Sequence, residues 1–315
     1  MASVKLTKLI EKMKLENLTP EVPVDKVRIS QPDINRPALQ IAGYFVYFDA
    51  SRIQIIGYVE YSYMENALGD DNAKRESYTK LMDNHIPAII FCRGLKPDEI
   101  FLDVARQTHT PVFSTTEATS AFTAEIIRWL NEELAPCISV HGVLVDVYGE
   151  GVLITGESGI GKSEAALELI KRGHRLVTDD VVELRKISDD LLMGSAPDIT
   201  KHFIELRGIG IVDVKALFGA SSVKDKQQVD LVIRLEDWDK DKDYDRLGLE
   251  ENYTEYLGNK LICHNIPVRP GRNLAIICES AAVNYRQKKM GYNAAQELYK
   301  RVQESLAKKR EEEEE

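Results

Sequence analysis

A glycine-rich segment, Gly156–Ser163, constrains the fold of this chain more than any other feature. It reads GESGIGKS and matches the pattern G-x-x-x-x-G-K-[ST]. A β-branched run, Val152–Thr155, precedes it, and Ser163–Arg172 has helical patterning and is followed by Gly173. A strand, a phosphate-binding loop and a helix in this order begin a phosphate-loop fold. The segment therefore predicts an α/β domain built around a nucleoside triphosphate.

The residue types of the loop explain how it would hold phosphate. Its glycines let backbone N–H groups turn toward phosphate oxygens, and the helix N-terminus adds partial positive charge. Lys162 is expected to neutralise the β- and γ-phosphates, and the Ser163 hydroxyl to coordinate Mg²⁺. The predicted nucleotide-binding residues are Gly156, Glu157, Ser158, Gly159, Ile160, Gly161, Lys162 and Ser163.

Two acids follow the next predicted strand, Arg175–Thr178. A path from strand through loop and helix to the next strand returns Asp179 and Asp180 to the nucleotide edge of the sheet. One carboxylate would serve magnesium, and the other would accept the proton of a hydroxyl nucleophile such as serine. A solvated pair of acids at a strand end is the alternative.

A second glycine motif lies in the apolar run Glu205–Val214, which also contains Arg207, Gly208 and Gly210. Glycines inside such a run indicate a backbone that passes close to another group. Glu205 is either a second carboxylate for Mg²⁺ or the partner of Arg207 in a buried turn. Composition does not separate these two interpretations.

Three further features carry weaker signals. His141 precedes the strand Val143–Tyr148, and most lone histidines are structural or exposed. Arg246 follows an acidic stretch, and Arg269-Pro270-Gly271-Arg272 forms a rigid turn. A guanidinium group binds two phosphate oxygens at once, although an isolated surface arginine is the commoner explanation.

The chain length of 315 residues favours two domains. Pro136 discourages continuation of the preceding helix, so we place the boundary near residue 133, with domains 1–133 and 134–315. The predicted fold class is α/β: an N-terminal α/β domain, then a P-loop domain with a C-terminal helix.

The expected strands are Ala42–Phe48, Ile53–Tyr63, Pro87–Cys92, Ile138–Tyr148, Gly151–Thr155, Arg175–Thr178, Val229–Leu235 and Leu274–Cys278. The expected helices are residues 4–16, Ser77–Asn84, Pro97–Thr108, Ser120–Leu134, Ser163–Arg172 and Ala294–Arg310.

Charge and composition exclude several classes of protein. The net charge of −10 argues against a general nucleic-acid or anionic-membrane surface. The four cysteines lie far apart, which suggests neither a zinc site nor a disulfide framework. No segment has the apolar length of a signal peptide or a membrane span. We therefore expect a cytoplasmic protein.

The motifs together resemble those of the bifunctional HPr kinase/phosphorylase family. The resemblance is carried by Arg36–Phe45, Val140–Gly149, the phosphate loop, Arg172–Asp180, Glu205–Val214 and Pro267–Asn273. It implies a carboxykinase-like P-loop kinase domain. It also implies a protein serine kinase that phosphorylates the phosphocarrier protein HPr, with ATP or pyrophosphate as the phosphoryl donor. The enzyme would remove that phosphate with inorganic phosphate to give pyrophosphate, and it would regulate carbon catabolite repression as a homohexamer.

The resemblance also implies residue roles. Asp180 would accept the proton in phosphorylation and donate it in the reverse reaction, with Lys162 and His141 also catalytic. Ser163 and Glu205 would bind Mg²⁺. Arg246 and the loop that contains Arg269, Pro270, Gly271 and Arg272 would matter for dephosphorylation, and Asp179, Arg207, Gly208 and Gly210 would lie in the catalytic region.

Two rival functions remain open at the level of sequence. One is a phosphate-loop enzyme that acts on a small molecule, such as a carboxykinase-like protein. The other is a nucleotide-binding regulatory scaffold without transfer chemistry. A GTPase switch is disfavoured because the nearest approach to the base-reading N-K-x-D motif, Asn259–Ile262, lacks the aspartate.

Overall fold

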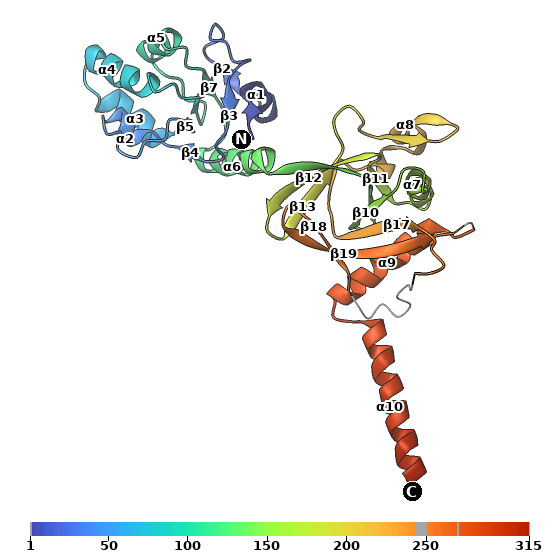
Figure 1. The fold of residues 1–315 in the computed structure, drawn as a ribbon. Helices are drawn as coiled ribbons and strands as arrows, with labels where there is room; N and C mark the ends of the chain where they lie inside the picture. Colours follow the sequence, from blue (N-terminus) through green and yellow to red (C-terminus); the bar gives the residue numbers. More distant parts are fainter. Residues whose placement is uncertain (1, 243–250, 270, 315) are drawn as a thin grey trace. The chain divides into compact units, whose positions relative to one another are not determined.

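The computed structural model describes residues 2–242, 251–269 and 271–314, with side chains up to residue 307. Arg246 and Pro270, which were singled out from the sequence, lie outside the described residues. The chain forms two compact units that divide between Ala135 and Pro136 (Figure 1).

The N-terminal unit is built on a five-stranded sheet with the order β2-β7-β6-β5-β4. Its strands are β2 (Glu16–Asn17), β4 (Ile34–Asn35), β5 (Ile53–Ile56), β6 (Ile89–Phe91) and β7 (Val112–Ser114). Strands β4 to β7 are parallel, and β2 runs antiparallel to β7. All residues of β5, β6 and β7 are buried, as in parallel sheets covered on both faces.

Helices cover both faces of this sheet. They are α1 (Leu6–Met13), α2 (Ala38–Ile41), α3 (Tyr58–Asn66), α4 (Asp71–Met82), α5 (Glu99–Gln107) and α6 (Thr119–Leu134), and a two-residue pair, β1 (Val4–Lys5) with β3 (Arg28–Ile29), stands beside α1. Apolar residues of α1 and α6 form one core with β5 and β7. Those of α4 and α5 form a second core with β6.

Two strand predictions in this unit are wrong. Ala42–Phe48 contains turns and no strand, and only Ile53–Ile56 of the segment Ile53–Tyr63 is extended. From Tyr58 onward the chain is helical, with Gly57 as the N-cap of α3. The buried Glu60 carboxylate accepts a hydrogen bond from the Gly57 N–H at 3.0 Å, which stabilises this start of the helix. The β-branched and aromatic residues of these segments therefore indicated strands where the structure has turns and a helix.

The C-terminal unit contains a six-stranded sheet with the order β11-β9-β10-β17-β19-β18. Its strands are β9 (Val143–Val147), β10 (Glu150–Gly156), β11 (Arg175–Thr178), β17 (Leu231–Asp237), β18 (Tyr253–Tyr256) and β19 (Asn259–Val268). Strands β10, β17 and β19 are parallel. Strand β11 runs in the same direction as β10, because both are antiparallel to β9. The carboxyl ends of β10 and β11 therefore lie at the same sheet edge.

Different layers cover the two faces of this sheet (Figure 1). Helices α7 (Lys162–Lys171) and α9 (Leu274–Lys289) pack on one face. A second sheet packs on the other through Leu144 and Leu153. Its order is β16-β13-β12-β8, with β8 (Cys137–His141), β12 (Val181–Ser188), β13 (Leu191–Ser195) and β16 (Lys226–Gln228). The unit is completed by the hairpin β14 (Phe203–Leu206) and β15 (Gly210–Asp213), by α8 (Val214–Phe218), by a 3₁₀ turn (Ala220–Ser222) and by α10 (Ala294–Glu314).

Two predictions in the C-terminal unit are also wrong. Ile138–Tyr148 is not one strand, because Gly142 separates β8 from β9 and the two strands join different sheets. A Cβ atom at Gly142 would lie 2.7 Å from the Ile154 carbonyl oxygen, so this crossing requires glycine. Leu274–Cys278, predicted as a strand, is the start of α9, where the Asn273 side chain accepts the Ile276 N–H. No helix in the described part of the chain is long and apolar enough to cross a membrane.

One buried charge joins three segments of this unit. The Asp146 carboxylate, 2% exposed, accepts hydrogen bonds from Arg175 at 2.7 Å, Lys224 at 2.8 Å and the Gly149 N–H at 2.7 Å. Burial alone would raise the pKa of Asp146, but the hydrogen bonds and the two positive charges outweigh it and lower the pKa. The ionised carboxylate therefore stabilises the fold at neutral pH.

We predict that Asp146→Asn lowers the free energy of unfolding by about 3 kcal/mol at pH 7, because a buried charge partner is removed. Since the folded-state pKa is depressed, this loss should shrink as the pH falls below about 4. Urea unfolding at several pH values measures it. Asp189→Asn, at a 95% exposed side chain paired with Lys186, is the control and should change stability by less than about 1 kcal/mol. Equal effects of the two substitutions would contradict the prediction.

Candidate active site

The phosphate loop joins the carboxyl end of β10 to the N-terminus of α7. Gly159 and Gly161 adopt φ angles of 89° and 101°, in the left-handed region that favours glycine. The strand, loop and helix arrangement proposed from the sequence is present. The amides at the start of α7 and the loop backbone border a cavity of about 100 Å³.

Lys162 lies beneath this loop and is only 7% exposed. Its ammonium group donates hydrogen bonds to the carbonyl oxygens of Gly156 at 2.9 Å and Glu157 at 2.8 Å. The loop therefore fixes the position of a buried positive charge on the cavity wall. A phosphate group in the cavity would meet that charge directly.

A chain of contacts runs from the loop to Asp179. The Ser163 hydroxyl donates to the two Asp179 oxygens at 2.9 and 3.1 Å, and the Glu205 N–H donates to the same carboxylate at 3.0 Å. Asp179 is 4% exposed, and burial raises its pKa despite these hydrogen bonds, with the neighbouring Asp180 charge adding to the rise. The fold thus holds a carboxylate beside the serine hydroxyl at a cost in desolvation.

Asp180 and His141 form the opposite wall. The His141 Nδ1 atom lies 3.1 Å from the Asp180 Oδ1 atom, and each side chain is more than half exposed. Asp180 has a φ angle of 69°, which is rare for a residue with a side chain, and its carbonyl oxygen accepts the Gly142 N–H at 3.0 Å. Pairing of β8 with β12 sets His141 opposite Val181, which brings the two side chains together.

Arg207 lies in the turn of the hairpin β14–β15 and reaches the phosphate loop. Its Nη2 atom donates to the Ser158 hydroxyl at 3.1 Å. A Cβ atom at Gly159 would lie 2.4 Å from the Arg207 Nη1 atom, so a side chain there would displace the guanidinium group. Gly208 and Gly210 both have positive φ angles in the tight turn that follows Arg207.

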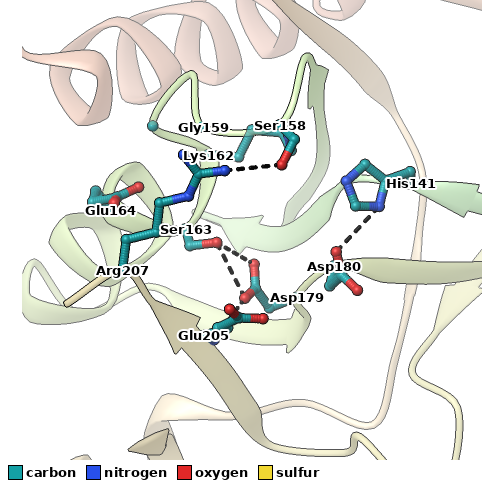
Figure 2. Close-up of a pocket in the computed structure, with 11 residues that line it drawn as sticks. His141, Ser158, Gly159, Lys162, Ser163, Glu164, Asp179, Asp180, Glu205 and Arg207 are labelled. Carbon is teal, nitrogen blue, oxygen red and sulfur yellow. Dashed lines mark hydrogen bonds and ion pairs between the residues drawn. The ribbon is translucent and has the colours of Figure 1, made fainter. Parts of the chain in front are cut away.

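These side chains line one cavity (Figure 2). Its wall includes His141, Ser158, Gly159, Gly161, Lys162, Ser163, Asp179, Asp180, Glu205 and Arg207, and also Glu164, which the sequence analysis did not single out. The wall carries the positive groups of Lys162 and Arg207 together with the carboxylates of Asp179, Asp180, Glu205 and Glu164, the last on the same side as Arg207 (Figure 2). This arrangement suits a phosphate group together with a divalent cation.

A metal ion in this cavity would take some of its ligands from the substrate. Among the described residues no group of three or more His, Cys, Asp or Glu side chains is placed to hold a metal ion. Mg²⁺ commonly uses one or two carboxylates and completes its octahedron with water and substrate phosphates. The Ser163 hydroxyl and the carboxylates of Asp179 and Glu205 fit that description.

Among the described residues of the predicted dephosphorylation turn, Arg269, Gly271 and Arg272 do not line this cavity. Arg269 stacks on the Trp238 ring, 3.2 Å from its centroid, and Arg272 donates to the Pro267 carbonyl oxygen at 2.8 Å. Gly271 has a φ angle of 84° in the same turn. Arg246 and Pro270 belong to the segments that the structure does not describe.

We predict that Asp179→Asn stabilises the ligand-free protein at pH 7. Because the folded-state pKa of Asp179 is raised, ionisation disfavours the folded state as the pH rises above the ordinary aspartate value, and asparagine removes that cost. The urea midpoint should be higher than that of the wild type at pH 7 and similar to it below about pH 4. A lower midpoint at pH 7 would show that the hydrogen bonds outweigh the desolvation.

Nearly the whole chain is similar to members of one protein family. Residues 4–130 match the family model described as HPr Serine kinase N terminus, and residues 132–302 match the one described as HPr Serine kinase C-terminal domain. The HPr kinase/phosphorylase of Lachnoclostridium phytofermentans is 66% identical over 309 residues, which are 98% of this chain and 99% of the relative.

A second relative, the HPr kinase/phosphorylase of Caldicellulosiruptor bescii, is 50% identical over 301 residues, 96% of each chain. The solved structure of the Hpr(Ser) kinase/phosphatase from Coxiella burnetii is 38% identical, covers 51% of this chain and 98% of its own, and aligns with a TM-score of 0.47. Since both family models match and full-length relatives are at least half identical, this chain belongs to the HPr kinase/phosphorylase family.

Proposed function

We propose that this protein transfers the γ-phosphoryl group of ATP to a seryl residue of HPr, and that it removes the phosphate from phosphoserine with inorganic phosphate as the acceptor. One observation carries the proposal: the loop with Lys162, the contact of Ser163 with Asp179, and the pair of Asp180 with His141 converge on one cavity. The full-length relatives, which are HPr kinase/phosphorylases, indicate the substrate.

In the forward direction the loop amides and Lys162 hold the ATP phosphates. Asp180 accepts the proton of the seryl hydroxyl, the seryl oxygen forms a bond to the γ-phosphorus, and the bond from that phosphorus to the β-bridging oxygen breaks to release ADP. His141, 3.1 Å from Asp180, orients the carboxylate. Ser163 and Glu205, beside Asp179, would hold a Mg²⁺ ion, which would neutralise part of the phosphate charge.

The reverse reaction uses the same groups. Inorganic phosphate in the loop attacks the phosphorus of phosphoserine, the bond to the seryl oxygen breaks, and protonated Asp180 returns its proton to that oxygen. The product is pyrophosphate. A loop that holds β- and γ-phosphates also fits phosphate and pyrophosphate, which explains how one site serves both directions.

The proposal extends to properties that the family resemblance implies. They are a carboxykinase-like P-loop kinase fold for residues 134–315, a separate α/β domain for residues 1–133, a homohexamer, a cytoplasmic location and a role in carbon catabolite repression. Arg246 and the turn with Arg269, Pro270, Gly271 and Arg272 are proposed to act in dephosphorylation. Arg207, Gly208 and Gly210 are proposed to close the catalytic cavity over the loop.

The direct test is incubation of the protein with HPr, ATP and Mg²⁺, followed by mass spectrometry for phosphoserine. Incubation of phosphorylated HPr with inorganic phosphate should then release pyrophosphate. Phosphorylation of a small metabolite without any phosphorylation of HPr would favour a small-molecule kinase instead. Failure of the wild type to modify HPr would refute the proposal.

We predict that Asp180→Asn lowers the rate of transfer in both directions by about 10²- to 10⁴-fold, because the general base is removed. Nucleotide binding should persist, since the loop, Lys162 and Ser163 remain intact. Calorimetric titration with ATP separates the two effects. Loss of ATP binding would mean that Asp180 supports the structure of the site, and Asp189→Asn at the exposed surface is the matched control.

A second prediction concerns the metal. Ser163→Ala removes a proposed ligand whose oxygen also contacts Asp179 at 2.9 Å. The Mg²⁺ concentration for half-maximal transfer should rise by roughly 10- to 100-fold, as for other losses in the ligand surroundings. Titration of the kinase rate with Mg²⁺ at saturating ATP measures this. An unchanged Mg²⁺ requirement would place the metal elsewhere.

A further inference from the structure

A second, larger cavity of about 520 Å³ lies beside the phosphate loop. Strand β8 of the four-stranded sheet contributes Val140 and His141 to its wall, and β10, β17 and β18 of the six-stranded sheet contribute Thr155, Arg234 and Tyr256. Its volume is within the range of ligand-binding pockets. His141 lines both this cavity and the one that contains Asp180, so the two are neighbours.

Thr155 in this wall has an unused hydroxyl. The residue is 8% exposed, and its Oγ1 atom is buried without a hydrogen-bond partner in the described chain. A buried hydroxyl without a partner destabilises the folded state, because it has lost its bonds to water. The Thr155 oxygen therefore contributes no stability to the fold, and valine, which has the same shape, should give a more stable protein.

Arg234 is the neighbour of Thr155 across the parallel pair β10 and β17. It is exposed, and its side chain forms no hydrogen bond or ion pair with any described residue. The guanidinium group and the threonine hydroxyl are thus two donors on one wall. Both are available to acceptor oxygens of an occupant.

The remaining lining defines the chemistry of that occupant. Val140 and the Tyr256 ring give apolar surface, whereas Glu157, Glu236 and Asp237 are acidic lining residues, of which Glu236 is paired with Lys242 at 2.7 Å. Because Lys242 offsets the charge of Glu236, the cavity has one arginine beside the two further acids Glu157 and Asp237, and this balance disfavours an anionic ligand. Carbonyl oxygens with an apolar side chain, which an extended polypeptide presents, match both the donors and the apolar walls.

The position of the cavity indicates which polypeptide. A serine whose hydroxyl meets Asp180 has its neighbouring residues next to His141, on the wall that the two cavities share. The nucleoside of ATP, by contrast, is bonded to the α-phosphate, which is the phosphate farthest from the transferred γ-phosphoryl group. We propose that the second cavity binds the main chain and an apolar side chain beside the seryl acceptor of the protein substrate; this rests on the proposed function.

The test uses the full-length protein with Thr155→Val and Arg234→Ala, each compared with the wild type. Each substitution should raise the KM and the calorimetric Kd for HPr by about tenfold, the equivalent of one lost hydrogen bond. The KM for ATP should not change. Thr155→Val should also unfold at the same or a higher temperature than the wild type, which a merely structural role for the hydroxyl would not allow.

Two matched controls are available. Thr155→Ser keeps the hydroxyl and should keep the affinity for HPr, and Lys260→Ala removes an exposed cation on β19 that does not line the cavity. A raised KM for ATP with an unchanged KM for HPr would assign the cavity to the nucleoside and overturn the inference. Unchanged values for both substrates would also overturn it. A wild type that neither binds nor phosphorylates HPr would refute the proposed function itself.

Discussion

The buried carboxylate of Asp179 is the contact on which the arrangement of the site depends. It accepts hydrogen bonds from the Ser163 hydroxyl at the start of α7 and from the Glu205 N–H in β14. These groups come from segments far apart in the sequence. One side chain thus joins the phosphate loop to the hairpin that carries Arg207. This contact adds to the pairing of β14 with β15 and to the buried Ile204 and Leu206 in holding Glu205 at the cavity.

The site contains several groups that lower the stability of the fold. Burial raises the pKa of Asp179, the Asp180 backbone occupies the left-handed region, and the Thr155 hydroxyl has no partner in the described chain. Each of these features costs stability, and all three lie within or beside the two cavities. Such local conflicts are expected where a chain is selected for chemistry as well as for folding. The buried charge of Asp146, by contrast, is fully paired and supports the fold.

Sequence patterns predicted the units whose signal is local. The phosphate loop, the strand Arg175–Thr178 and the helix that follows Lys162 depend on neighbouring residues, and the structure contains all three. Patterns failed where distant contacts decide the conformation. Leu274–Cys278 is apolar and fits a strand or a helix; in the structure it is the capped first part of α9, which packs beside α7 on the sheet. Gly142 divides a continuous apolar run because the two halves join different sheets.

By itself, the sequence determined that a phosphate loop exists, that two acids follow the next strand, and that the motifs resemble one family. It left open which acid contacts the loop serine, because that depends on a left-handed turn at Asp180 that no spacing reveals. Tertiary structure decided that Asp179 contacts Ser163 and that Asp180 faces His141. It also revealed the cavity at Thr155 and Arg234, since strand pairing alone brings those residues together.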